Sequence, residues 1–122
     1  EENRQAIKDA EANLRLNRLP EGQVRFIAGR VEEEISRLSI RLKADTTVVM
    51  DPPRQGCHPK VLSAVFEQLR PSRAVYVSCN PEALAKELPV ILRAGYRVTR
   101  VQAVDMFPHT NHIETVMAFE RG

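Results

Sequence analysis

The pattern of apolar and polar positions along the chain switches between helical and strand periodicity. Apolar residues recur at helical spacing in four segments, which predicts helices over residues 3–17, 31–42, 59–69 and 81–94. Runs of β-branched and apolar residues predict strands over residues 24–28, 46–50, 74–77, 96–106 and 113–120. Pro89 lies inside the last predicted helix and is expected to kink it. Strands that alternate with helices predict an α/β fold built on a parallel sheet.

The last two predicted strands differ from the others because no helix separates them. Residues 96–106 and 113–120 are joined only by residues 107–112, so they should pair antiparallel. The predicted sheet is therefore mostly parallel with one antiparallel C-terminal strand. The chain also opens on a helix, whereas a doubly wound nucleotide-binding domain usually begins with a strand and a glycine-rich loop. We therefore expect a sheet that lacks its first strands, as in an N-terminally truncated domain.

Composition narrows the class of protein. The 122 residues, 43% of them apolar, suit one domain with an ordinary core. Eighteen basic and sixteen acidic residues leave a net charge of +2, which neither indicates nor excludes a nucleic-acid partner. Nothing in the sequence resembles a signal peptide or a membrane span, so no membrane partner is expected. The two cysteines, Cys57 and Cys79, follow different predicted strands, which fits a reducing cytoplasm.

Cys79 stands at the carboxyl end of an apolar run and directly before Asn80 and Pro81. Asn80 is a preferred helix N-cap and Pro81 a preferred first helical residue, so Cys79 is predicted at a strand-to-helix corner. The partial positive charge of the helix N-terminus favours the thiolate, which is the nucleophilic form of cysteine. A lone cysteine on an apolar strand is also often simply buried. A nucleophile and a structural cysteine are therefore both open at this point.

Two acidic residues are predicted to share the sheet edge with Cys79. Asp51 closes the preceding strand, and right-handed crossovers bring the carboxyl ends of both strands to one edge. The strand over residues 96–106 should run parallel to the Cys79 strand, so the returning strand begins at this edge with Glu114. The convergence of an acid, a thiol and a second acid suits covalent catalysis on an electrophilic carbon, followed by proton removal by a carboxylate.

The segment Asp51-Pro52-Pro53-Arg54 has two interpretations. The prolines either simply end a strand, or they form a rigid polar corner that holds a planar base or a cofactor amine, with Arg54 on a phosphate. His109 and His112 are three residues apart, but we expect no metal site because no third ligand clusters with them. Cys57 is interpreted as incidental to catalysis.

Three motifs, in this order along the chain, are specific in combination. They are Asp51-Pro52-Pro53-Arg54-Gln55-Gly56, Ser78-Cys79-Asn80-Pro81 and Asp105-Met106-Phe107-Pro108-His109-Thr110-Asn111-His112-Ile113-Glu114. Together they resemble the RNA uracil-5-methyltransferase family, and the resemblance covers residues 1–122 as the C-terminal part of the catalytic domain. It implies a class I, Rossmann-like methyltransferase sheet, S-adenosyl-L-methionine as the cofactor, and methylation of C5 of a uridine in tRNA or rRNA.

The resemblance also implies roles for individual residues. Cys79 would be the nucleophile that adds to C6 of the uracil, and Glu114 the base that removes the proton from C5. Glu1 matches the acid that holds the ribose hydroxyls of the cofactor, and Asp51 is expected to lie between the cofactor and the base. The expected contacts with the RNA substrate come from Asp51, Arg54, Asn80 and His109.

Two other functions stay open. Amino-methyltransferases that act on adenine use a similar Asp-Pro-Pro corner, but they place a stacking aromatic residue where this chain has Arg54. A non-catalytic RNA-binding or assembly module that keeps the methyltransferase-like fold is the second alternative. Because the family carries its glycine-rich cofactor loop before the position of Glu1, we expect residues 1–122 alone to bind the cofactor weakly and to be inactive. We also expect them to associate with another chain or a missing N-terminal part, across a gap between strands 24–28 and 46–50.

Overall fold

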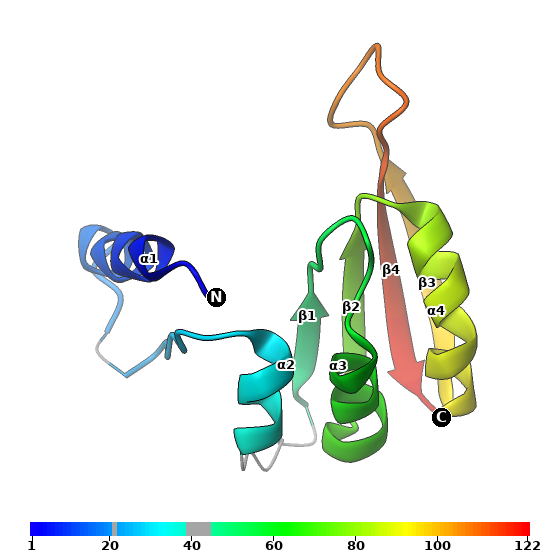
Figure 1. Ribbon diagram of the computed structural model, residues 1–122, viewed down its shortest axis with the longest axis horizontal. Helices are drawn as coiled ribbons and strands as arrows, with labels where there is room; N and C mark the ends of the chain where they lie inside the picture. The colour runs from blue at the N-terminus through cyan, green and yellow to red at the C-terminus, as the bar shows by residue number, and fades with distance from the viewer. Residues whose placement is uncertain (21, 39–44) are drawn as a thin grey trace. The chain divides into compact units, whose positions relative to one another are not determined.

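The computed structural model describes residues 1–20, 22–38 and 45–122, which fall into two compact units, Glu1–Ser39 and Ile40–Gly122. Unit 1 contains the helices α1 (Arg4–Leu16) and α2 (Val31–Glu34) and the 3-10 helix η1 (Ile35–Arg37). Unit 2 contains the strands and the remaining helices, shown in Figure 1: β1 (Thr47–Met50), α3 (Pro59–Ser63), the π-helical turn η2 (Ala64–Leu69), β2 (Arg73–Ser78), α4 (Pro81–Arg93), β3 (Tyr96–Val104) and β4 (Glu114–Arg121).

Helix α1 confirms the first predicted helix, whereas the helix predicted over residues 31–42 is shorter than expected. The side chain of Asn3 caps α1 by accepting hydrogen bonds from the backbone N–H groups of Gln5 and Ala6. The second helix narrows to a 3-10 turn and ends at Leu38, whose backbone is extended. Helices as short as α2 and η1 are only marginally stable without tertiary packing. Neither of them contains a buried residue. Residues 39–42 of the prediction lie outside the described residues.

The strand predicted over residues 24–28 is wrong. This segment forms no strand, although Glu1 makes two backbone hydrogen bonds beside it. The amino group of Glu1 donates to the Ile27 carbonyl at 3.2 Å, and the Gly29 N–H donates to the Glu1 carbonyl at 2.9 Å. These two bonds alternate as in a parallel ladder, but both are made by the same partner residue, Glu1. A strand needs a partner several residues long, which local apolar character does not supply.

The sheet of unit 2 confirms the predicted topology. Its strand order is β1-β2-β4-β3, with β1 parallel to β2 and β4 antiparallel to both of its neighbours. Three strands therefore point in one direction and β4 in the other. A β-bulge between Val98 and Arg100 shifts the register of β3 against β4. Figure 1 shows α3 and α4 on one face of this sheet.

The core of unit 2 lies between the sheet and these helices. Alternate residues of β2, Ala74, Tyr76 and Ser78, are buried, as the two-residue period of a strand requires. Phe66 of η2 is completely buried and packs edge-on against Tyr96 and Phe119, at ring-centroid distances of 4.9 and 6.1 Å. Such pairs add to the stabilisation from burial alone, so this aromatic cluster holds the helix layer on the sheet.

Helix α4 begins as its sequence predicts, and the kink expected at Pro89 stays a prediction. Pro81 occupies its first turn, Asn80 is its N-cap, and the helix runs through Pro89 to Arg93. Its buried residues, Leu84 and Ile91, belong to the predicted apolar stripe. The start of this helix, and with it the corner at Cys79, is therefore well specified locally.

Candidate active site

Three loops meet at one edge of the sheet in unit 2. They are residues 51–58 after β1, residues 79–80 after β2, and residues 105–113 between β3 and β4 (Figure 1). The first two lie together because β1 and β2 are parallel. The third joins them because β3 has the same direction as β2, so the chain returns into β4 at the same edge. The topology thus gathers the three motifs that stand out in the sequence.

The register of β2 against β4 brings Cys79 and Glu114 to adjacent positions. Ser78, the last residue of β2, pairs with Thr115, so Cys79 directly follows β2 at the end of the ladder where β4 begins with Glu114. Both Cys79 and Glu114 are half-buried. Neither side chain forms a hydrogen bond with another described residue, which leaves the thiol and the carboxylate accessible for chemistry.

The corner that carries Cys79 is held by the side chains on either side of it. Ser78 is buried, and its hydroxyl donates to the Asn80 carbonyl at 2.9 Å and accepts from the Asn80 N–H at 3.1 Å. The Asn80 side-chain oxygen accepts from the backbone N–H groups of Glu82 and Ala83, at 3.2 and 3.4 Å. These bonds keep the cysteine between a strand end and a helix start.

The same Asn80 side chain connects this corner to the loop after β1. Its amide nitrogen donates to the Arg54 carbonyl at 2.9 Å. Within that loop a turn is closed by the Gly56 N–H, which donates to the Pro53 carbonyl at 2.9 Å. Asp51 is exposed and its carboxylate has no hydrogen-bond partner among the described residues. The structure therefore brings Arg54 and Asn80 together and leaves Asp51 open to a ligand.

The loop between β3 and β4 contacts the loop after β1 through a histidine that the sequence analysis left without a substrate role. The Arg54 guanidinium donates from Nη2 to Nδ1 of His112 at 3.3 Å. The ring of His112 also lies edge-on to Phe107, at a centroid distance of 6.5 Å. In the sequence, His112 stands three residues after His109 and two residues before Glu114, and neither spacing indicated a contact with Arg54.

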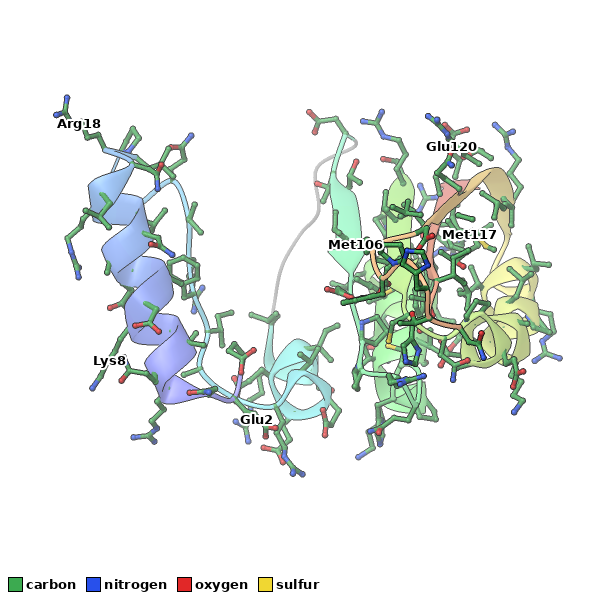
Figure 2. The ribbon with its side chains drawn as sticks, turned by 90° about the horizontal axis from the view of Figure 1, so that it is seen from above. Glu2, Lys8, Arg18, Met106, Met117 and Glu120 are labelled. Carbon is green, nitrogen blue, oxygen red and sulfur yellow. The ribbon has the colours of Figure 1, made fainter. Side chains whose placement is uncertain are left out.

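His109, the predicted substrate contact in that loop, lies in a turn and makes no hydrogen bond within the described chain. Its φ of 67° falls in the left-handed region, and the turn is closed by Thr110, which donates to the Phe107 carbonyl at 2.7 Å. Figure 2 looks onto this edge of the sheet and shows Met106, another exposed residue of the loop. Among the described residues, no hydrogen bond joins His109 to the other candidate residues.

A second group that sequence reasoning missed is centred on Glu87 of α4. Oε1 of Glu87 accepts from the Cys57 N–H, and Oε2 accepts from the Tyr76 hydroxyl, both at 2.6 Å. Burial raises the pKa of Tyr76, and the hydrogen bond to Glu87 raises it further. Tyr76 therefore stays a neutral donor. No local sequence pattern predicts this cluster, because its members come from a strand, a loop and a helix.

Glu1, the predicted cofactor residue, belongs to unit 1. Its Oε1 accepts from the Asn3 N–H at 2.7 Å, and the side chain is exposed. One carboxylate oxygen therefore stays available to hydroxyl donors. Glu2, beside it, pairs with Arg30 at 3.2 Å on the surface.

In the part of the chain that the structure describes, no group of three or more His, Cys, Asp or Glu side chains is arranged to hold a metal ion. None of the described helices is long and apolar enough to cross a membrane.

Comparison with known proteins shows what the chain is similar to. A model of the tRNA (uracil-5-)-methyltransferase family matches residues 5–122. A protein named as an uncharacterized RNA methyltransferase from Caldanaerobacter subterraneus subsp. tengcongensis is 44% identical over 118 residues, 97% of this chain and 25% of that protein. One from Chlorobaculum tepidum, with the same description, is 47% identical over 96% of this chain and 24% of its own length. The chain spans about a quarter of the length of these relatives.

Solved structures with low sequence identity share the fold. The methyltransferase domain of bacterial CtHen1-C superposes with a TM-score of 0.67 at 14% identity, over 100% of this chain and 75% of that one. The M. jannaschii TYW2 structure, solved in complex with AdoMet, gives a TM-score of 0.59 at 19% identity, over 100% of this chain and 56% of that one. The predicted class I methyltransferase sheet is confirmed by these neighbours.

Proposed function

Since the chain belongs to the tRNA (uracil-5-)-methyltransferase family, we propose that it carries the nucleophile and the base for methylation of C5 of a uridine in tRNA or rRNA, through a covalent Cys-C6 adduct. The observation that supports this proposal is the register of β2 and β4, in which Ser78 pairs with Thr115, so that Cys79 follows β2 at the edge where β4 begins with Glu114. The reaction requires a thiol and a carboxylate, and neither of these two side chains forms a hydrogen bond within the described part of the chain.

The chemistry assigns a separate step to each group. C5 of uracil is a poor nucleophile, and addition of the Cys79 thiolate to C6 moves the electrons of the C5–C6 double bond into an enolate, so C5 becomes nucleophilic. The carboxylate of Glu114 then removes the C5 proton once C5 has been methylated. The double bond re-forms as the C6–S bond breaks, which returns Cys79 as a thiolate. The target uridine must leave its stack to reach Cys79.

We assign S-adenosyl-L-methionine as the cofactor, which when bound supplies an electrophilic methyl group. Glu1 offers a free carboxylate oxygen to ribose hydroxyls, and the Asp51 carboxylate is exposed and without a partner among the described residues. Carboxylates are the groups that hold ribose hydroxyls and amines in cofactor sites. Asp51 follows β1 at the edge that carries Cys79, so we assign it a place between cofactor and base.

Contacts with the RNA are assigned to the loops around this edge. Arg54 is exposed and has five N–H donors, one of which contacts His112, so the others are available for a phosphate. Asn80 keeps one amide N–H beyond its bond to the Arg54 carbonyl. His109 lies exposed in the loop before Glu114. We propose that the enzyme acts in the cytoplasm.

The free edge of β1 supports the proposal that a further polypeptide segment pairs with the sheet. Among the described residues β1 is bonded to β2 only, and Val49 at its centre is 67% exposed. Unpaired strand edges with apolar side chains favour association. Light scattering of residues 1–122 is expected to show self-association, and a monomer at all accessible concentrations would contradict it.

The function is tested by two substitutions in the longest form of the protein that its gene encodes. Cys79→Ala removes the atom that adds to C6, so neither adduct nor 5-methyluridine should form. Glu114→Gln should still add and methylate, but lose turnover by about 10²–10⁴-fold because elimination lacks its base. Denaturing gels of labelled RNA with S-adenosyl-L-methionine should show a slow-migrating adduct for Glu114→Gln and none for Cys79→Ala.

Glu82→Ala, on an exposed position of α4, is the control for loss of a carboxylate near the site. It should methylate at the normal rate. Near-normal methylation by Cys79→Ala would refute the nucleophile assignment and leave Cys79 as a structural residue. RNA binding without methylation by the unsubstituted protein would instead support a non-catalytic module.

A further inference from the structure

Glu87 accepts two short hydrogen bonds from groups that lie far apart in the sequence. The Cys57 N–H of the loop after β1 and the Tyr76 hydroxyl of β2 each donate to one of its carboxylate oxygens at 2.6 Å. Glu87 is half-buried and Tyr76 is completely buried. Hydrogen bonds to an ionised acceptor in such surroundings are stronger than those between neutral groups. One side chain of α4 therefore joins the loop, the sheet and the helix.

The loop is shaped to make this contact. Gly56, directly before Cys57, has a φ of 92°, in the region that favours glycine. A Cβ atom at this position would overlap Oε1 of Glu87. The absence of a side chain at Gly56 is thus required both by the backbone conformation and by the close approach of the carboxylate.

The other end of the loop is bound to the corner that carries Cys79. The Asn80 side chain donates to the Arg54 carbonyl at 2.9 Å, and the Gly56 N–H closes a turn onto the Pro53 carbonyl at 2.9 Å. Between the end of β1 and Cys57, the loop is therefore held at both Arg54 and Cys57. Removal of one attachment leaves the segment between β1 and Cys57 held at a single point.

We propose that Glu87 is a positioning residue for the uridine methylation, an inference that rests on the function proposed above. Its carboxylate fixes the backbone at Cys57, and through the Pro53–Gly56 turn it holds Asp51 and Arg54 at the edge shared with Cys79. Glu87 itself does not touch the reacting atoms. Misplacement of a positioning group by about 1 Å reduces rates by roughly 100-fold, so this hydrogen bond is expected to matter for the reaction rate.

The test uses Glu87→Ala and Glu87→Gln in the longest form that the gene encodes, with Glu82→Ala as a matched loss of charge on the same helix. Amide hydrogen exchange of residues 51–58 reports the order of the loop. The rate of covalent adduct formation with RNA containing 5-fluorouridine reports the reaction, because fluorine at C5 cannot be removed as a proton and the adduct accumulates. Filter binding gives the affinity for the same RNA, and a melting curve gives the stability.

Glu87→Ala should speed exchange at Cys57 by about 10- to 100-fold, since a hydrogen bond to a charged group is lost. It should slow adduct formation by roughly 100-fold. Glu87→Gln retains an acceptor for the Cys57 N–H and a polar partner for the Tyr76 hydroxyl, so it should restore the rate to within about 10-fold of normal. Glu82→Ala should match the unsubstituted protein. If Glu87→Ala does not fold, Tyr76→Phe removes one donor and keeps the ring, and should slow the adduct by about 10-fold.

Two results would overturn the inference. One is a normal rate of adduct formation in Glu87→Ala despite faster amide exchange, which would mean that the reaction does not depend on an ordered loop over residues 51–58. The other is a Glu87→Gln variant as slow as Glu87→Ala, which would mean that the hydrogen-bond positions are not what matters. Failure of the proposed function looks different, because the unsubstituted protein would then form no adduct with 5-fluorouridine RNA at all.

Discussion

Substitution of Gly56 by alanine should destabilise the protein much more than the same change at Gly95. Both glycines have left-handed backbones, with φ of 92° and 91°. An alanine in this region costs about 1–2 kcal/mol at either site. A Cβ at Gly95 meets no atom within 4 Å, whereas a Cβ at Gly56 overlaps Oε1 of Glu87. Gly95 is therefore a control with the same backbone cost and no overlap.

The additional cost at Gly56 follows from the hydrogen bond that must give way. Relief of the overlap moves the Glu87 carboxylate away from the Cys57 N–H, which it binds at 2.6 Å. Loss of a hydrogen bond to a charged group costs about 1.5–3 kcal/mol. Gly56→Ala should thus lower the free energy of unfolding by about 2 kcal/mol more than Gly95→Ala. With a urea m-value near 2 kcal/mol/M, the midpoints should differ by roughly 1 M.

Urea denaturation of the two variants, followed by far-ultraviolet circular dichroism, provides the comparison. Equal midpoints would refute the argument, because they would mean that the loop and Glu87 separate at no cost. A third variant, Gly56→Ala combined with Glu87→Ala, removes the overlapping carboxylate. If the overlap is the cause, the alanine at position 56 should cost only its backbone term in that background, about 1–2 kcal/mol.

Further predictions follow from the core and the helix cap. Phe66→Ala should lower the free energy of unfolding by about 3–5 kcal/mol in urea denaturation, because a fully buried ring is lost. Asn80→Ala should lower the free energy of unfolding by about 1 kcal/mol, because the helix cap is lost. Asn80→Asp should keep the cap and lose only the hydrogen bond to the Arg54 carbonyl. Faster amide exchange of residues 51–58 would reveal that loss. Because the pKa of Tyr76 is raised, the folded state holds this proton more tightly than the unfolded state. The free energy of unfolding should therefore fall as the pH rises above the usual tyrosine pKa of 10. Tyr76→Phe should make that fall shallower. An equal pH dependence in the two proteins would contradict the last prediction.

The sequence alone predicted most of unit 2. Proline at the first turn, an asparagine cap and apolar spacing placed α4 correctly, and β-branched runs located all four strands of the sheet. These features depend on neighbours close in the chain. The absence of a helix between β3 and β4 also predicted the reversed strand, and connectivity then brought Asp51, Cys79 and Glu114 to one edge.

Only the tertiary structure decided which side chains meet there. The Ser78–Thr115 register places the start of β4 at Glu114 next to the end of β2, which Cys79 follows, and a shift of one residue would have turned Glu114 to the other face of the sheet. Glu87 was not identifiable in advance, because its two donors, Cys57 and Tyr76, come from separate elements.

The segment over residues 24–28 has the local composition of a strand, yet it forms none. Strand formation depends on backbone hydrogen bonds to a partner several residues long, and among the described residues this segment and its flank are bonded to Glu1 alone in that manner. Local composition predicts which segments are suited to a strand. Whether such a segment becomes one is decided by long-range pairing, whose free energy is absent from the segment's own sequence.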